Sequence, residues 1–160
     1  APGRRETGSG RPRNYRNFRR GDIIVSLAGV ATNLVIGLAC VALIPAFGFI
    51  GRTIPALDVS AGILQAMMAI GVLLNFMLVA FNLIPIPPLD GSHVMKYLLP
   101  ASISRLYQQF WRYGIILLVG IMWIDPRPLN YWLTPAFKSA DFLLGSVDGT
   151  MLQSTKQWLK

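Results

Sequence analysis

Two long stretches without a charged residue set the strongest limit on how this chain can fold. The first covers residues 23–49 and the second residues 59–89. A helix needs about 20 apolar residues to cross the hydrocarbon core of a bilayer, and both stretches exceed that length. The sequence therefore predicts two transmembrane helices. The second should end near Ile84, because Pro85 and the prolines after it lack the backbone donor that a helix needs.

The overall composition agrees with a membrane protein. Hydrophobic residues account for 53% of the 160 residues and charged residues for only 14%, which is about half the charged share of an average soluble domain. We therefore expect an all-α polytopic membrane protein.

Two further helices are expected downstream. A third uncharged run, residues 113–124, is short, but extended back to Leu106 it would form a shallow third span, which we favour over a re-entrant or interfacial helix. Apolar residues then recur at helical spacing, which predicts an amphipathic C-terminal helix at the membrane surface, with a frayed tail as the alternative. The residues behind that prediction are Trp132, Phe137, Met151, Leu152, Thr155, Trp158 and Leu159.

Positive charge is concentrated at the start of the chain. The formal net charge is +8, and seven of the fifteen basic residues lie in the first twenty positions, directly before the first apolar run. Such a cluster sets the orientation of the first helix and contacts anionic lipid, so we expect a lipid bilayer and no nucleic acid as the partner. The positive-inside rule places the N-terminus in the cytoplasm. The seven residues are Arg4, Arg5, Arg11, Arg13, Arg16, Arg19 and Arg20.

The charge pattern also divides the chain into three segments. Residues 1–21 form a basic polar tail, residues 22–125 a transmembrane domain, and residues 126–160 an interfacial tail. The expected location is an integral position in a bacterial-type cell membrane.

Asp90 is the first candidate for a functional residue. It follows a proline-rich break at the end of the second apolar run, and a carboxylate at the edge of a span is costly unless it is paired, solvated or bound to metal. Irregular backbone at membrane depth is tolerated only inside protein or beside water. The alternative is a charge that merely ends a span, as we expect for Asp22 and Asp58.

Two amides precede this aspartate in the same apolar run. Asn75 and Asn82 are seven residues apart, so they share one helix face, and buried amides in a membrane need partners. They either bind another backbone or join neighbouring helices. In the first run, Gly29, Asn33 and Gly37 recur every four residues and predict the surface where the two spans approach closely.

His93 is the only histidine in the chain. It could serve as a metal ligand or a proton carrier, but without a second ligand nearby we favour a polar residue at the membrane interface. Lys96 and Tyr97 are typical interfacial anchors.

Residues 81–93 resemble the site-2 protease family of intramembrane zinc metalloproteases. They match its signature N-x-x-P-x-P-x-L-D-G from Asn82 to Gly91, and residues 14–22 and 26–33 resemble the segment that enters the preceding helix. The resemblance implies that Asp90 is a ligand of the catalytic zinc. It also implies that Asn82 and Asn75 bind the unwound backbone of a transmembrane helical substrate.

The other family signature, H-E-x-x-H, is absent from these 160 residues. It supplies two zinc ligands and a general base, whereas this chain has one histidine, after Asp90, and one glutamate, Glu6 in the polar tail. One carboxylate does not hold a catalytic zinc. We therefore expect an inactive portion of a protease whose H-E-x-x-H helix precedes Ala1. The alternatives are a pseudoprotease or a membrane scaffold that binds transmembrane partners without cleavage. Self-association is also expected, because the polar side chains of Asn75, Asn82 and Asp90 would otherwise face lipid.

Overall fold

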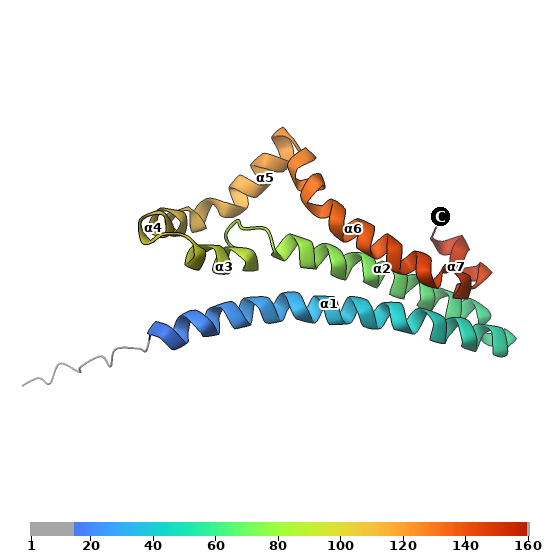
Figure 1. Ribbon diagram of the computed structural model, residues 1–160. Helices are drawn as coiled ribbons and strands as arrows, with labels where there is room; N and C mark the ends of the chain where they lie inside the picture. Colours follow the sequence, from blue (N-terminus) through green and yellow to red (C-terminus); the bar gives the residue numbers. More distant parts are fainter. Residues whose placement is uncertain (1–14, 160) are drawn as a thin grey trace, which may run out of the picture.

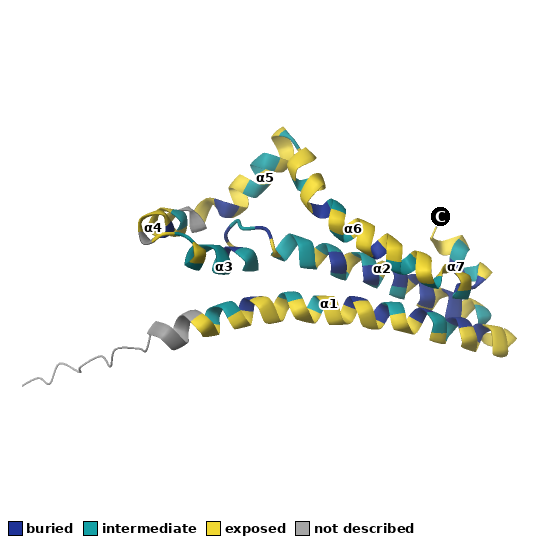
Figure 2. Cartoon of the chain, viewed as in Figure 1, coloured by how far each residue is buried: buried dark blue, intermediate teal, exposed yellow. Residues whose placement is uncertain are grey.

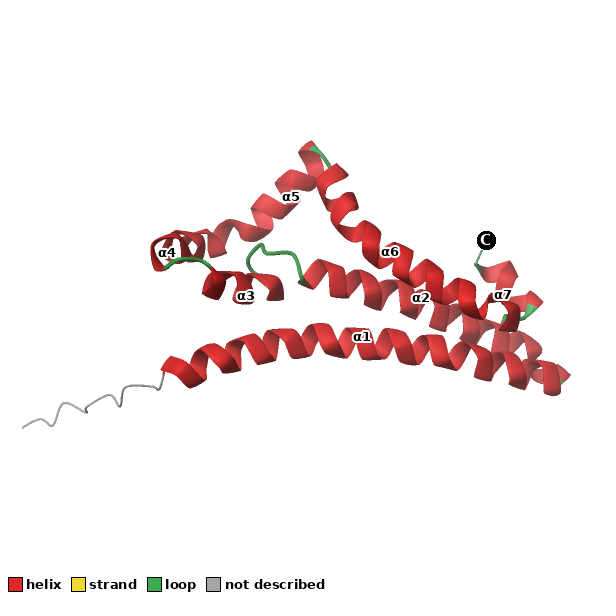
Figure 3. Ribbon diagram, in the orientation of Figure 1, coloured by secondary structure: helices red, strands yellow, loops and turns green. Residues whose placement is uncertain are grey.

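The computed structural model describes residues 15–159, which are mainly helical with short connecting loops and contain no strand (Figure 3). The Arg-rich residues 1–14 lie outside the described part of the chain. The α-helices are α1 (Tyr15–Thr53), α2 (Asp58–Asn82), α3 (Asp90–Leu98), α4 (Ala101–Gln109), α5 (Gly114–Ile124), α6 (Arg127–Val147) and α7 (Gln153–Trp158). The short 3-10 helices are η1 (Pro55–Leu57), η2 (Phe110–Tyr113) and η3 (Asp148–Thr150).

The two predicted spans are confirmed as α1 and α2. Among the described helices these are the two that are long and apolar enough to cross a membrane. They pack side by side as a hairpin (Figure 1), and α2 ends at Asn82, close to the expected end. A Cβ atom on Gly37 would lie 3.0 Å from the ring of Phe76 and 3.3 Å from Cβ of Asn75. The absence of a side chain at Gly37 therefore allows the close approach that the small-residue stripe predicted.

The expected third span is much shorter than a span requires. The apolar helix α5 has 11 residues, so its length is about 16 Å against a hydrocarbon core of about 30 Å. It is preceded by η2 and by the separate helix α4, and it meets α6 in a sharp turn at Asp125 and Pro126 (Figure 1). This geometry agrees with the alternative interpretation, a helix that does not cross the membrane by itself.

The C-terminal segment differs from the single surface helix that we expected. Most of it forms α6, which lies along α2 (Figure 1). At one end of α6 the indole N–H of Trp132 donates to the backbone oxygen of Ala80 at 2.9 Å. Further along, Ala140 is fully buried in a cluster with Cys40 and Val72. Since α6 follows α2 through the bundle, its apolar stripe serves helix packing.

The end of the chain is anchored to α1 and α2 by Gln65. This side chain is fully buried; its amide nitrogen donates to the oxygens of Ile44 (2.7 Å) and Thr150 (3.2 Å). Its amide oxygen accepts from the backbone N–H of Leu152 (3.0 Å) and the hydroxyl of Thr155 (2.6 Å). Met151, Leu152 and Thr155 are buried against the ends of the two long helices, where Figure 2 shows the densest group of buried positions. Their apolar periodicity thus reflects packing within the protein.

Candidate active site

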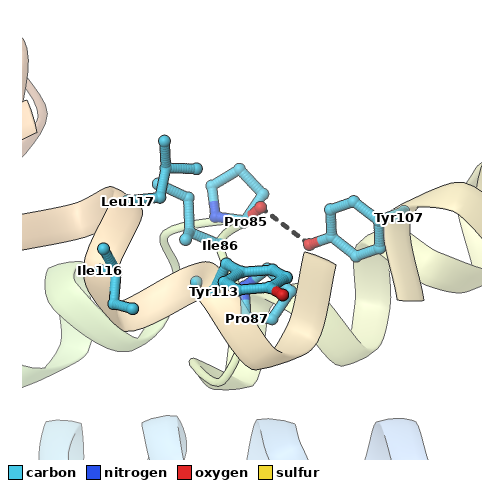
Figure 4. A pocket seen from close by; sticks show the side chains of 8 residues that line it. Pro85, Ile86, Pro87, Tyr107, Tyr113, Ile116 and Leu117 are labelled. Carbon is cyan, nitrogen blue, oxygen red and sulfur yellow. Dashed lines mark hydrogen bonds between the residues drawn. The ribbon is translucent and has the colours of Figure 1, made fainter. Parts of the chain in front are cut away.

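The proline-rich break forms a loop between α2 and α3, and two downstream helices brace it. The hydroxyl of Tyr107 on α4 donates to the backbone oxygen of Pro85 at 2.8 Å (Figure 4). Gly114 at the start of α5 lies so close to the loop that a Cβ atom there would overlap the carbonyl group of Pro87. Because these contacts involve backbone carbonyls of the loop, they fix its path as the chain turns from α2 into α3.

An apolar hollow of about 460 Å³ lies beside this loop. Figure 4 shows the side chains that surround it, drawn from the loop and from the segment that includes α4 and α5. The lining residues are Pro85, Ile86, Pro87, Tyr107, Tyr113, Gly114, Ile116 and Leu117.

Asp90 is the first residue of α3, and its carboxylate lies against α1. Its Oδ2 atom is 3.2 Å from the position that a Cβ atom on Gly29 would take. Gly29 therefore leaves the space that the carboxylate occupies, which is a different role from the α1–α2 contact that we predicted for it. Gly91 follows Asp90 and lies against the backbone of Leu83 and Ile84, where a side chain would overlap the Leu83 oxygen. The carboxylate is thus held at a junction of α1, α2 and α3.

Asp22 on α1 forms a polar cluster with three side chains of α3. One carboxylate oxygen lies 3.1 Å from Nδ1 of His93, and the other accepts a hydrogen bond from Tyr97 at 2.9 Å and forms an ion pair with Lys96. Burial, together with the neighbouring carboxylate of Asp22, raises the pKa of the Tyr97 phenol. Asp22 therefore does more than end a span, because Lys96 and Tyr97 bind it and so pair α3 with α1. Their role as anchors at the membrane interface stays a prediction.

The cluster also sets how α3 lies on α1. Asp90 contacts α1 at Gly29, and the side chains three to seven residues later contact α1 at Asp22. The two helices therefore run antiparallel along each other, with Asp90 at one end of the contact and the Asp22 cluster at the other.

The comparisons with known proteins add the family. The model of the family described as "Peptidase family M50" matches residues 8–124. The chain belongs to peptidase family M50. A protein of Bacillus subtilis (strain 168) named "Putative zinc metalloprotease YwhC" is 31% identical over 121 residues, which are 72% of this chain and 52% of that protein. The chain thus spans about half the length of this curated relative. No solved structure matches this chain.

The name of this relative assigns zinc to that protein, whereas the described residues of this chain do not form a complete zinc site. No group of three or more His, Cys, Asp or Glu side chains comes together among them. The ring of His93 faces Asp22, and its position at the membrane interface stays a prediction. Because catalytic zinc takes three protein ligands, Asp90 accounts for at most a part of the set.

The two predicted amides lie on α2 at different depths. Asn75 is half-buried and donates to the backbone oxygen of Gly71 at 2.8 Å, within its own helix. Asn82 is the last residue of α2 and is also half-buried. Within the described residues neither amide forms a hydrogen bond with Asp90, so their roles in substrate binding stay predictions.

The sequence did not predict the contacts of two polar residues of this M50 chain, Asp22 and Gln65. The partners of Asp22 lie more than 70 positions away in the sequence, so no local pattern could identify them. Gln65 could have been found, since an amide in the middle of an uncharged run already indicates a buried polar contact.

Proposed function

We propose that this chain forms part of the catalytic centre of an intramembrane zinc metalloprotease of the site-2 protease type, in which Asp90 supplies one ligand to the zinc. The observation that carries the proposal is the position of the Asp90 carboxylate. It lies at the broken end of a membrane-spanning helix, against the open backbone at Gly29, within the part of the chain that matches peptidase family M50.

The chemistry explains why a carboxylate belongs at this point. When bound, a zinc ion activates water and polarises the peptide carbonyl. In this chain, the loop braced by Tyr107 and Gly114 and the fit of Asp90 against Gly29 hold the carboxylate in place. A site at the end of a span, next to irregular backbone, also has access to water that the middle of the bilayer lacks.

The substrate in this proposal is a transmembrane helix that unwinds to present a peptide bond. Its freed backbone N–H and C=O groups need polar partners, and the side chain of Asn82 is the nearest candidate in the sequence to Asp90. Asn75, two turns earlier, would contact the substrate further from the site. We also propose that the N-terminus lies in the cytoplasm, because the basic cluster precedes α1.

The remaining zinc ligands in this proposal come from outside these 160 residues. The shortage of zinc ligands also favours a second candidate function. H-E-x-x-H is absent from these 160 residues, and the described residues form no cluster of metal-binding side chains. That candidate is a pseudoprotease or scaffold that binds transmembrane helices and does not cleave them.

The experiment measures the zinc content of the full-length native protein, purified from its own membranes, and of two variants. Asp90→Asn removes the proposed ligand, and Asp125→Asn is the matched control, because Asp125 pairs with Arg127 outside the site. We expect the affinity for zinc to fall more than about 100-fold in Asp90→Asn. Changing a residue that only hydrogen-bonds to a zinc ligand costs about 10–100-fold, and loss of the ligand itself should cost more. The control should bind as the wild type does.

Cleavage of a transmembrane substrate in the same preparations separates the two candidates. The protease proposal requires that wild-type protein and Asp125→Asn cut the substrate and that Asp90→Asn does not. If the wild-type protein neither binds zinc nor cuts the substrate, the non-cleaving function is correct. If Asp90→Asn keeps its zinc, the ligand assignment is wrong.

A further inference from the structure

Helix α6 carries two opposite charges at the depth where the neighbouring helices are apolar. Lys138 helps to line an open hollow of about 450 Å³ together with Leu34 and Leu38 of α1 and Phe76 of α2. Leu34 and Leu38 lie at the middle of the uncharged run 23–49. Asp141 follows Lys138 by three residues, next to the buried Ala140. Since α1 and α2 cross the membrane, both charges lie near its centre.

Charges at that depth require partners. The middle of the run is about 20 Å along the helix from either end, and only charges near helix ends reach the interface by extending their side chains. In the described part of the chain, neither Lys138 nor Asp141 forms an ion pair or a side-chain hydrogen bond. Both side chains are exposed. A lipid environment is therefore unsuitable for this face of α6.

The charges belong to a regular stripe on the outer face of α6. The stripe, Thr134, Lys138, Asp141 and Gly145, has spacings of four, three and four residues, which is the spacing of a seam between two parallel helices. At about 100° per residue the stripe is turned by roughly 90–150° from the face that packs on α2, where Leu133 and Ala140 are buried, and Lys138 lies at the edge of the hollow beside α1. A small residue such as Gly145 allows two helices in a membrane to approach closely.

We propose that this stripe binds the same stripe of a second copy of the chain, with Lys138 of each copy beside Asp141 of the other. Two copies inserted in the same direction are related by a two-fold axis along the membrane normal, so their stripes meet at the same depth. Lys138 of one copy is then offset by about 4.5 Å along the helix from Asp141 of the other, a distance that its long side chain spans. A self-complementary stripe neutralises all four charges at once. A partner with a single charge would leave one charge unpaired. The inference rests on the charges of α6 and on the membrane-spanning position of α1 and α2, and it does not depend on the protease function.

Cysteine cross-linking in native membranes tests the contact. In a Cys40→Ala background, Gly145→Cys places a thiol on the stripe, where the added Cβ meets no atom within 4 Å. Ser146→Cys is the matched control, since it is exposed and lies one residue away, about 100° around the helix. We expect mild oxidation to give a disulfide-linked dimer for Gly145→Cys and at least about five times less for the control. Equal dimer yields, or none for Gly145→Cys, would overturn the contact.

Charge exchange tests whether Lys138 and Asp141 make that contact. Adding Lys138→Asp or Asp141→Lys to Gly145→Cys should suppress the dimer, and combining both should restore it, because the exchanged pair is again self-complementary. Restoration also shows that the single variants did not merely misfold. A cross-link to a protein of different mass, or single variants that form the dimer as before, would show that the stripe faces another partner or water, and the proposal would be wrong.

Discussion

Replacing Gln65 by Leu should detach the C-terminal segment from the two long helices. The leucine has a similar volume but removes all four hydrogen bonds that the buried amide makes. The hydroxyl of Thr155 can turn to a carbonyl of its own segment. The N–H of Leu152 and the backbone oxygen of Thr150 then lose their hydrogen bonds to Gln65, and the leucine side chain offers no polar atom to replace them.

The size of the effect follows from those two groups. Each buried polar group without a partner costs about 1–3 kcal/mol, while hydrogen bonds inside membrane proteins average about 0.6 kcal/mol. We therefore expect Gln65→Leu to lower the free energy of unfolding by about 2–4 kcal/mol. The control is Gln157→Leu, which changes an exposed amide on α7 and should cost less than about 0.5 kcal/mol.

Unfolding in detergent by increasing denaturant gives the free energy, and limited proteolysis shows where the loss occurs. Cleavage should increase between α6 and α7, near Gly149, with α1 and α2 protected. The reasoning is refuted if Gln65→Leu unfolds within about 0.5 kcal/mol of the wild type, or if the control loses as much.

Three further changes test the contacts around the candidate site. Gly114→Ala adds a methyl group where the loop backbone already lies and should cost about 1–3 kcal/mol in thermal unfolding, whereas Gly120→Ala on the same helix meets open space and should be neutral or stabilising by up to about 1 kcal/mol. Asp22→Asn leaves a half-buried lysine without its carboxylate and should cost about 1–3 kcal/mol; an unchanged melting temperature would show that the cluster does not hold α3. The pKa of Tyr97 is raised in the fold, so its contribution to stability should be complete below pH of about 10 and be lost as pH rises through the higher folded value. Absorbance titration of Tyr97→Phe against the wild type measures this, and a phenol that ionises at its ordinary pH would contradict the contact.

The sequence predicted those parts of the fold that depend on local composition. The uncharged runs identify α1 and α2 because membrane length and hydropathy are properties of contiguous residues, and the prolines after Ile84 mark the end of α2. The motif likewise identified Asp90 as the carboxylate at the break. These features need no knowledge of distant contacts.

The remaining features depend on which segments meet in space. The apolar periodicity of residues 126–160 is the same for a helix on a membrane surface and for a helix packed on α2. Contacts in the fold distinguish them, such as the hydrogen bond from Trp132 to Ala80 and the burial of Ala140. The role of Asp22 likewise depends on α3 folding back along α1. Sequence pattern predicted the types of these residues but not their partners.

The spacing of the polar contacts along α1 has a consequence for the membrane that houses it. Asp22 binds α3 near one end, and the backbone oxygen of Ile44 binds Gln65 near the other. Asp22 and Ile44 are 22 positions apart, which corresponds to about 33 Å of helix, close to the thickness of a bilayer's hydrocarbon core. The length of the bundle between these two contacts is therefore fixed, since α1 cannot slide along its neighbours without breaking polar contacts at both ends. In a membrane of different thickness, the bundle has to tilt as a unit or the lipid has to thin or thicken around it, because the two helices cannot shift along each other.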